Sequence, residues 1–308
     1  MTVSPSLSQL LALPLVAAPM TGVSGPDLVI AACRKGVIGS FPTHNARTVD
    51  ELDEWLGRMS DELGSGVGLV APNLVVHPTN RRLDADIDRL VAHRVRLVIT
   101  SVGSPAPVME RLRASGCAVY ADVATLRQAE RAIDVGVDGL VLLTAGAGGQ
   151  TGQANPFAFV RAVREIFDGT IVAAGGISDG RAVLAAEVLG ADLAYMGTQF
   201  IATRESLASP EYRDALVRST MDDVRLSDEV SGLPASLLAE WLDRRQGASV
   251  EAGDFQEDRL TASPDVWSAG HSVSGVRDVP DVATLVSRVA GEYAEAKDML
   301  RATLVAAG

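Results

Sequence analysis

Two glycine-centred turns in the second half of the chain have the residue types and the spacing of an anion site. One follows the apolar run Thr170–Ala174, and the other follows Leu193–Met196. The segment between them, 179–189, has apolar residues at helical spacing. Backbone N–H groups at two such turns, after adjacent parallel strands, can converge on one phosphate; tight turns with no ligand are the alternative. The four turn residues are Gly175, Gly176, Gly197 and Thr198.

Three further segments carry residues that could contact a ligand. The first apolar run ends in residues 18–22, where Pro19 makes a rigid turn that can support a flat molecule or simply close the connection. Asn73 lies in an apolar run, so its amide needs partners, either the edge of a heterocycle or backbone groups. Residues 145–152 contain four glycines, which leave the backbone free to flex or to lie against a ligand.

The elements that would position these residues are short strands alternating with helices. Eight apolar runs begin 21 to 31 residues apart, the length of one strand–helix unit. They predict an α/β fold, a (β/α)8 TIM barrel over residues 1–206. A doubly wound open sheet is the competitor, but no GxGxxG follows the first run. The runs are Leu15–Met20, Val37–Phe41, Val67–Leu74, Leu97–Val102, Ala118–Val123, Gly139–Thr144, Thr170–Ala174 and Leu193–Phe200.

The pattern changes after Ser206. Residues 207–248 are predicted to be helical with a break at 231–234, and 249–263 to be an exposed acidic connection. The whole segment 207–275 is expected to be a cap over the barrel mouth. The remainder, 276–308, is expected to contain a terminal helix from about Val282 to Val305 that packs back on the barrel.

Composition narrows the function classes. The net charge is −12 over 308 residues, which argues against a nucleic-acid partner. No apolar run reaches the ~20 residues of a membrane span, and the start lacks the basic region of a signal peptide. Two cysteines and four scattered histidines predict neither a disulfide framework nor a metal site. We therefore expect a cytoplasmic protein.

Several motifs together resemble the nitronate monooxygenase family, also called the 2-nitropropane dioxygenase family, whose relatives include flavin-dependent enoyl-thioester reductases. The likeness covers most of the chain and is more specific than any single motif. The motifs are LVAAPMTGVSGPDL at 15–28, PNLVVHP at 72–78, VITSVGSP at 98–105, AGG at 147–149, AAGGISDGR at 173–181, ADLAYMGTQFIAT at 191–203, SGLP at 231–234 and WSAG at 267–270.

The resemblance implies a barrel with an added cap, FMN as cofactor, a small-molecule substrate and a homodimer. The two glycine turns would hold the FMN phosphate, in agreement with the spacing argument. The other implied cofactor contacts line the flavin ring or pass beside it and the ribityl chain. They are Ala18, Pro19, Met20, Thr21, Asn73, Ala147, Gly148 and Gly149.

The sequence departs from the family at positions that bear on catalysis. Nitronate-oxidising members carry a histidine after Ala-Gly-Gly, where this chain has Gln150, whose amide can orient a substrate but cannot take up a proton. A glutamine usually follows WSAG, where this chain has His271. Gln150 and His271 are the candidate catalytic residues. His44 and His77, in loops after the second and third runs, are candidates for substrate contact.

The leading expectation is therefore an FMN-dependent oxidoreductase that oxidises alkyl nitronates with O2. Gln150 favours an alternative, a reductase or dehydrogenase that uses NAD(P)H and acts on an unsaturated acyl thioester. A flavin-free phosphate-binding lyase or isomerase is a second alternative, although Asp122 is the only acid inside the eight runs. A protein that binds FMN without catalysis is a third.

Overall fold

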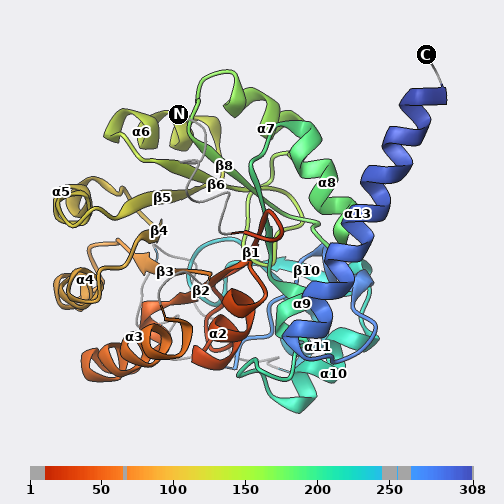
Figure 1. The fold of residues 1–308 in the computed structure, drawn as a ribbon. Coiled ribbons are helices and arrows are strands. Elements are labelled where there is room, and N and C mark those ends of the chain that lie inside the picture. The colour runs from red at the N-terminus through yellow and green to blue at the C-terminus, as the bar shows by residue number, and fades with distance from the viewer. Residues whose placement is uncertain (1–10, 65–67, 245–254, 256–264, 307–308) are drawn as a thin grey trace.

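The computed structural model describes residues 11–64, 68–244, 255 and 265–306. Eight parallel strands close into a barrel in the order β1-β2-β3-β4-β5-β6-β8-β9, and β9 pairs with β1 (Figure 1). The register is continuous around the ring, with Val16 opposite both Ile38 and Tyr195. The barrel strands are β1 Leu15–Ala17, β2 Ile38–Pro42, β3 Leu69–Val75, β4 Leu97–Ser101, β5 Ala118–Val123, β6 Gly139–Leu143, β8 Thr170–Ala174 and β9 Leu193–Met196.

Helices surround the barrel on its outer face, as Figure 1 shows. Several helices are capped by the residue before them, whose side chain accepts a hydrogen bond from a backbone N–H of the first turn. Thr125 caps α6 in this way, and Asp179 caps α8. No helix in the described ranges is long and apolar enough to cross a membrane. The helices of the barrel are α2 Pro26–Arg34, α3 Val49–Leu63, α4 Leu83–Ala92, α5 Ala106–Ala114, α6 Leu126–Val135, α7 Pro156–Arg164, α8 Gly180–Leu189 and α9 Thr198–Ile201, with a short helix η1 at Thr43–Asn45.

Each of the eight apolar runs overlaps one barrel strand, which confirms the predicted (β/α)8 barrel. The start of the third run, at position 67, lies outside the described residues. Side chains alternate along each strand. One set, including Val16, Ile99 and Val172, fills the barrel interior, and the other packs under the helices.

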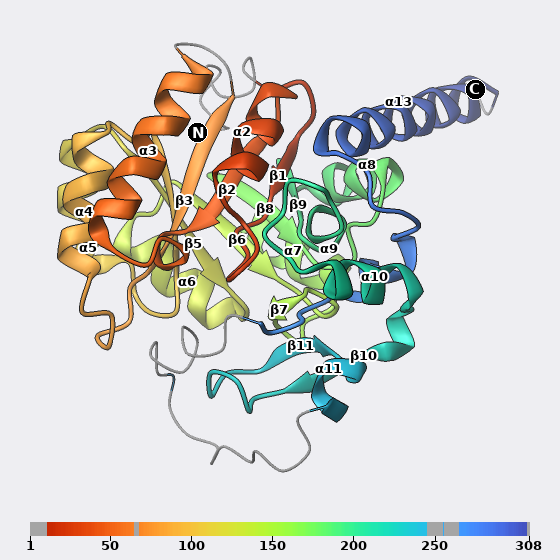
Figure 2. The same cartoon turned by 90° about the horizontal axis from the view of Figure 1, so that it is seen from below.

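A small antiparallel sheet covers the carboxyl ends of the barrel strands (Figure 2). It consists of β7 Gly149–Gln150, β10 Val224–Ser227 and β11 Ala235–Leu238. Residues 207–248 are therefore not helical throughout: the helices are α10 Pro210–Arg218 and α11 Ala239–Arg244, with a short helix η2 at Met221–Asp223. The helical prediction was wrong here because four-residue strands give too little pattern to separate alternation from helical spacing.

The 145–152 segment is held by this sheet as well as by the barrel. Gln150 pairs with Ala235 and Gly149 with Ser236, and the N–H of Thr151 donates to the carbonyl of Pro234 at 3.3 Å. The 145–152 segment is therefore not a flexible loop, and it does not need a ligand to hold it in place. The sheet, α10, α11 and the short helix η3 His271–Gly275 enclose a second apolar core that includes Tyr212, Leu237 and Trp267.

The chain ends in α13, Val282–Ala306, which packs on α8 and projects past the body of the protein at its carboxyl end (Figures 1 and 2). Gly180, the first residue of α8, lies against the backbone of Val289 and Tyr293. Tyr293 donates from its hydroxyl to Glu187 of α8 at 2.6 Å. The acidic connection expected at 249–263 lies outside the described residues, apart from the buried Phe255.

Candidate functional site

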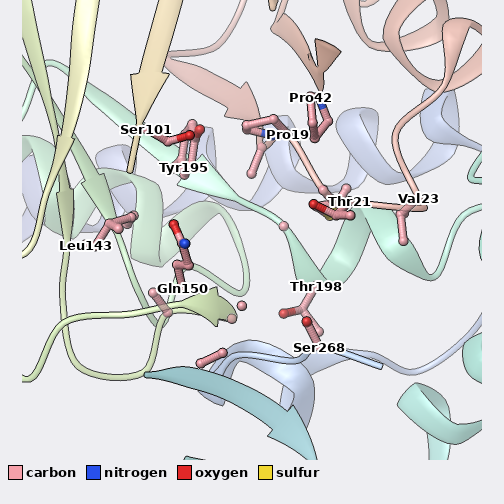
Figure 3. Close-up of a pocket in the computed structure, with 18 of the residues that line it drawn as sticks. Pro19, Thr21, Val23, Pro42, Ser101, Leu143, Gln150, Tyr195, Thr198 and Ser268 are labelled. Carbon is pink, nitrogen blue, oxygen red and sulfur yellow. The ribbon is translucent and has the colours of Figure 1, made fainter. Parts of the chain in front are cut away.

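A cavity opens at the carboxyl ends of the barrel strands, between the barrel and the antiparallel sheet (Figure 3). Loops at this end of a (β/α)8 barrel are where its chemistry lies. The structure brings every expected cofactor residue to this one cavity, together with Gln150 and His44. The expected cofactor residues are Ala18, Pro19, Met20, Thr21, Asn73, Ala147, Gly148, Gly149, Gly175, Gly176, Gly197 and Thr198.

The two glycine turns lie side by side because β8 and β9 are neighbours, with Ala174 opposite Tyr195. Gly176 has φ +72°, and a β-carbon placed on it would meet nothing within 4 Å. A side chain there would be strained and would project into open space. Gly197 also leaves room, with the nearest atom, Met20 Sδ, 3.5 Å from such a carbon. The backbone is therefore open at Gly176 and Gly197, which suits a phosphate group.

The WSAG motif fastens the tail to this surface. The N–H of Gly270 donates to Thr198 Oγ1 at 3.0 Å, and His271 donates from its N–H to the carbonyl of Gly146 at 2.9 Å. Trp267 stacks on Tyr212 with ring centroids 5.4 Å apart. The hydroxyl of Tyr212 also donates to the carbonyl of Ser268. The motif therefore holds one wall of the cavity in place.

Gln150 points from β7 into the cavity (Figure 3). Its side chain is half-buried, and its amide makes no hydrogen bond to the residues that the structure describes. The amide is thus available to orient a bound molecule, but it has no group that could abstract a proton near neutral pH.

The turn after β1 is braced by the loop after β2. Asn45 donates to the carbonyls of Met20 and Ser24 and accepts from the N–H of Gly22 at 2.9 Å. His44 Nε2 lies 3.0 Å from the hydroxyl of Thr21. Burial lowers the pKa of His44 to about 4, with a smaller effect from the charge of Arg82. His44 is therefore a neutral imidazole in the cavity wall at physiological pH.

Asn73 is buried at the end of β3, and its amide is held by the barrel. It donates to the carbonyl of Ile99 at 3.2 Å and accepts from the hydroxyl of Ser101 at 3.1 Å. Backbone and side-chain groups thus satisfy part of its hydrogen bonding and fix its orientation. The remaining donor and acceptor capacity of the amide faces the cavity.

Two of the histidines singled out in the sequence do not line the cavity. His77 lies against Phe255, with ring centroids 5.1 Å apart, and contacts the hydroxyl of Thr79 at 2.9 Å. The side chain of His271 is exposed and packs over Gly146 on the far side of the cavity wall. The positions of His77 and His271 therefore do not support a direct role in catalysis for either residue.

Two polar residues that the sequence reading did not place in the site lie in its floor. Asp122 follows Ala118 and Tyr120 on the inner face of β5, and Tyr195 follows Leu193 on the inner face of β9. Strand alternation could have found both, because each lies two residues beyond an interior side chain. The sequence shows Asp122 inside an apolar run, but strand alternation is needed to show that its side chain points into the barrel.

A second cavity adjoins the first between α6, α7 and the loop after β7, with largely apolar walls. Its lining shares Val102, Asp122, Leu143 and Gln150 with the first cavity. Val102 has φ +53°, a conformation that costs a β-branched residue roughly 1–3 kcal/mol. Such strain at the junction of two cavities is a feature of functional sites.

These observations define the class of protein. It is a (β/α)8 barrel whose last two strands end in open glycine turns, beside a cavity that is lined by strand ends, by the antiparallel sheet and by the tail. No Lys or Arg from the described ranges lines that cavity. Its polar groups are backbone N–H groups, hydroxyls, amides, the His44 imidazole and the Asp122 carboxyl.

Comparison with known proteins names the family. The model of the nitronate monooxygenase family matches residues 69–305, and the chain belongs to this family of flavin-dependent oxidoreductases. The chain is 26% identical over 230 residues to a (3aS,4S,5R,7aS)-5-hydroxy-7a-methyl-1-oxo-octahydro-1H-indene-4-carboxyl-CoA dehydrogenase of Rhodococcus jostii. The match covers 73% of this chain but only 62% of the length of that relative.

Two solved structures resemble the whole fold. A nitroalkane oxidase from Streptomyces ansochromogenes superposes with a TM-score of 0.83 at 26% identity and covers 96% of this chain and 99% of its own. An enoyl reductase domain from the macrolactin cluster of Bacillus amyloliquefaciens gives a TM-score of 0.78 at 15% identity, with 99% of each chain covered. The second likeness shows the fold alone.

Proposed function

We propose that this protein is an FMN-dependent oxidoreductase that oxidises alkyl nitronates, with O2 as the electron acceptor. The observation that carries the proposal is the convergence of all the expected cofactor residues on one cavity, where the glycine turns after β8 and β9 lie beside the turn after β1. FMN, when bound, would supply the two-electron chemistry. The residues of this chain would hold it and orient the substrate.

The cavity fits FMN rather than a free sugar phosphate. The backbone at Gly176 and Gly197 leaves room for a phosphate group, while Pro19 and Met20 add an apolar part to the wall of the same cavity. Asn73 presents amide groups suited to the edge of a heterocycle. A flavin-free lyase or isomerase would need a lysine or a pair of carboxylates in the cavity, and the described lining offers neither.

Within this proposal Gln150 and His44 limit the chemistry. Gln150 stands where nitronate-oxidising relatives of the sequence pattern have a histidine, and the His44 imidazole has a pKa of about 4. A general base works best with a pKa near the working pH. The site is therefore suited to a nitronate, which has already lost its proton, and not to a neutral nitroalkane.

One observation favours a second candidate, a dehydrogenase or reductase of acyl thioesters that uses NAD(P)H. The Gln150 amide and the hydroxyl of Tyr195 are neutral donors that could polarise a thioester carbonyl. The Rhodococcus relative is named as a dehydrogenase of a carboxyl-CoA compound. The apolar second cavity could hold the carbon skeleton of such a substrate.

The visible spectrum of the purified protein, followed by anaerobic mixing, tests both candidates. Bleaching of the flavin by an alkyl nitronate, with no effect of NADH or NADPH, is the result expected of a nitronate monooxygenase. Bleaching by a nicotinamide would instead establish the reductase. A protein that takes up no flavin even when FMN is added would contradict both.

The phosphate cradle can be tested by Gly176→Val. A β-branched residue at φ +72° is strained and projects into the cradle, so we expect FMN retention to be lost while the circular dichroism spectrum stays that of the folded barrel. Gly116→Val is the matched control. Gly116 has φ +79° and equally open surroundings, but lies after α5, away from the cavity. Retention of FMN by Gly176→Val would contradict the assignment.

The homodimer and the cytoplasmic setting expected from the sequence stay predictions. Light scattering at several concentrations measures the first: a mass near twice 32.2 kDa is expected, and a mass near 32.2 kDa would contradict it.

A further inference from the structure

Asp122 is a carboxyl group placed where the barrel gives it no counter-charge. It lies on the inner face of β5, and its Oδ1 is buried with no hydrogen-bond partner among the described residues. Burial raises the pKa of Asp122 to about 8, and no other cause contributes to the shift. Buried carboxyl groups without a partner are neutral acids near pH 7, and a neutral acid carries one O–H donor.

Tyr195 is a second unsatisfied donor in the same floor. Its hydroxyl is buried and has no partner within the described ranges. Burial raises the pKa of Tyr195, and the nearby Asp122 raises it further. Buried polar atoms in folded proteins are nearly all hydrogen-bonded, so two that face the same cavity call for a partner inside it.

The groups around the two cavities leave Asp122 without an ion pair. Arg131 at the rim of the second cavity is exposed, and His44 in the first is neutral. Burial also raises the pKa of Tyr212, which keeps its proton. No charge from these elements therefore holds Asp122 ionised.

We propose that Asp122 is a neutral hydrogen-bond donor at the junction of the two cavities, and that with Tyr195 it binds an oxygen or nitrogen acceptor of the molecule lying there. The proposal rests on the proposed function in that the acceptor belongs either to the flavin ring or to the substrate. Asp122, like Gln150, lines both cavities, so a molecule that extends from one to the other must pass it.

Binding of the acceptor at Asp122 should depend on pH. When Asp122 loses its proton, the donor becomes an acceptor with a negative charge, and it repels the atom it had bound. Binding of the acceptor should therefore weaken as the pH rises through about 8. An amide at the same position would donate at every pH and should remove this dependence.

The first measurement is the protonation state of Asp122 in the FMN-free protein. Infrared difference spectra of wild type and Asp122→Asn at pH 6.5 should contain the carbonyl band of a protonated carboxylic acid, which disappears as the pH is raised to 9.5. Absence of this band at pH 6.5 would overturn the proposal. The measurement does not depend on whether the protein binds flavin.

The second measurement is the dissociation constant of FMN, from fluorescence titration between pH 6 and 9.5. If the acceptor is on the flavin, Asp122→Leu should weaken binding about tenfold, and wild type should lose affinity above pH 8. Asp122→Asn should bind with little pH dependence. Tyr195→Phe should weaken binding by a smaller factor.

A third titration distinguishes the substrate as the source of the acceptor. In that case all variants have the same dissociation constant for FMN. The weaker binding by Asp122→Leu and the loss of affinity of wild type above pH 8 then appear when a nitronate or a saturated acyl thioester is titrated and the flavin spectrum is recorded. If neither titration depends on residue 122, the proposal is wrong. If wild type binds no FMN, the proposed function fails instead, and the infrared result decides on Asp122 separately.

Discussion

The N–H of Gly270 donates to the hydroxyl of Thr198, joining residues 72 apart in the chain across a buried 3.0 Å hydrogen bond. Gly270 also lies against the backbone of Gly146 and Gly148. The end of the last barrel strand, the loop after β6 and the tail thus meet at one point. The tail is part of the binding site because it braces two of its walls.

Gly270→Ala should break this contact. A β-carbon there would lie 2.5 Å from the carbonyl oxygen of Gly146 and 2.8 Å from the nitrogen of Gly148, so backbone must move. We expect a loss of about 1–3 kcal/mol in the free energy of unfolding and a roughly tenfold weaker FMN complex. Denaturant unfolding and fluorescence titration measure the two effects.

Gly291→Ala is the control for that variant. It makes the same change inside α13, where the added carbon meets nothing within 4 Å. Alanine is a better helix former, so this variant should gain up to about 1 kcal/mol and bind FMN as wild type does. Equal FMN affinity in both variants would show that the Gly270 contact does not shape the site.

Gln150→His should add the base that the cavity lacks. An imidazole at this position can take up a proton near its usual pKa, so turnover of a neutral nitroalkane should rise about 100-fold, with a rate that increases through about pH 6.5. Turnover of the corresponding nitronate should change less than about threefold, because no proton has to be removed. Oxygen consumption with nitroethane and with its nitronate measures both.

Gln153→His serves as the control, since Gln153 lines only the second cavity. A similar gain in both variants would mean that the imidazole acts without being placed over the flavin. No gain in Gln150→His would mean that position 150 does not control the proton transfer.

Asp122→Asn should stabilise the FMN-free protein, and more so at high pH. Between the ordinary value of 3.8 and the raised pKa of about 8, the folded protein holds a proton that the unfolded chain has lost. The contribution of Asp122 to the free energy of unfolding of wild type is therefore greatest below about pH 4, and it decreases as the pH rises towards 8. Asp122→Asn has no such decrease. Above pH 8 its free energy of unfolding should exceed that of wild type by on the order of a few kcal/mol.

Denaturant unfolding at pH 5.5 and 8.5 checks this prediction. The difference between Asp122→Asn and wild type should be larger at pH 8.5. A difference that does not grow with pH would show that Asp122 is already ionised in the folded protein.

The barrel could be predicted because its signals are local. Each buried parallel strand is an apolar run, and glycine turns mark the strand ends at which ligands bind. Gly176 and Thr198 were predicted in this way, and both line the cavity. For Pro19 and Asn73 the residues left a structural role and a ligand contact open, and the flavin contact was implied only by the resemblance; both residues line the cavity.

What the sequence could not show depends on contacts between distant segments. β7 has two residues and exists only because β11, more than 80 positions later, pairs with it. His271 stands in a promising motif, but the turn of the tail places its side chain outside the cavity. Asp122 could be recognised as unusual, but its missing partner is a property of the closed barrel.

The pairing of β7 with β11 also bears on how this scaffold could be redesigned. Gln150 takes its position from Ala235 in the antiparallel sheet, whereas the cradle of Gly176 belongs to the barrel ladder. The position of residue 150 can therefore be changed from the sheet, without altering the barrel turns at Gly176 and Gly197. A library of variants confined to residues 224–234 should re-aim residue 150 and yield new selectivities, and it leaves Ser236, the partner of Gly149, unchanged.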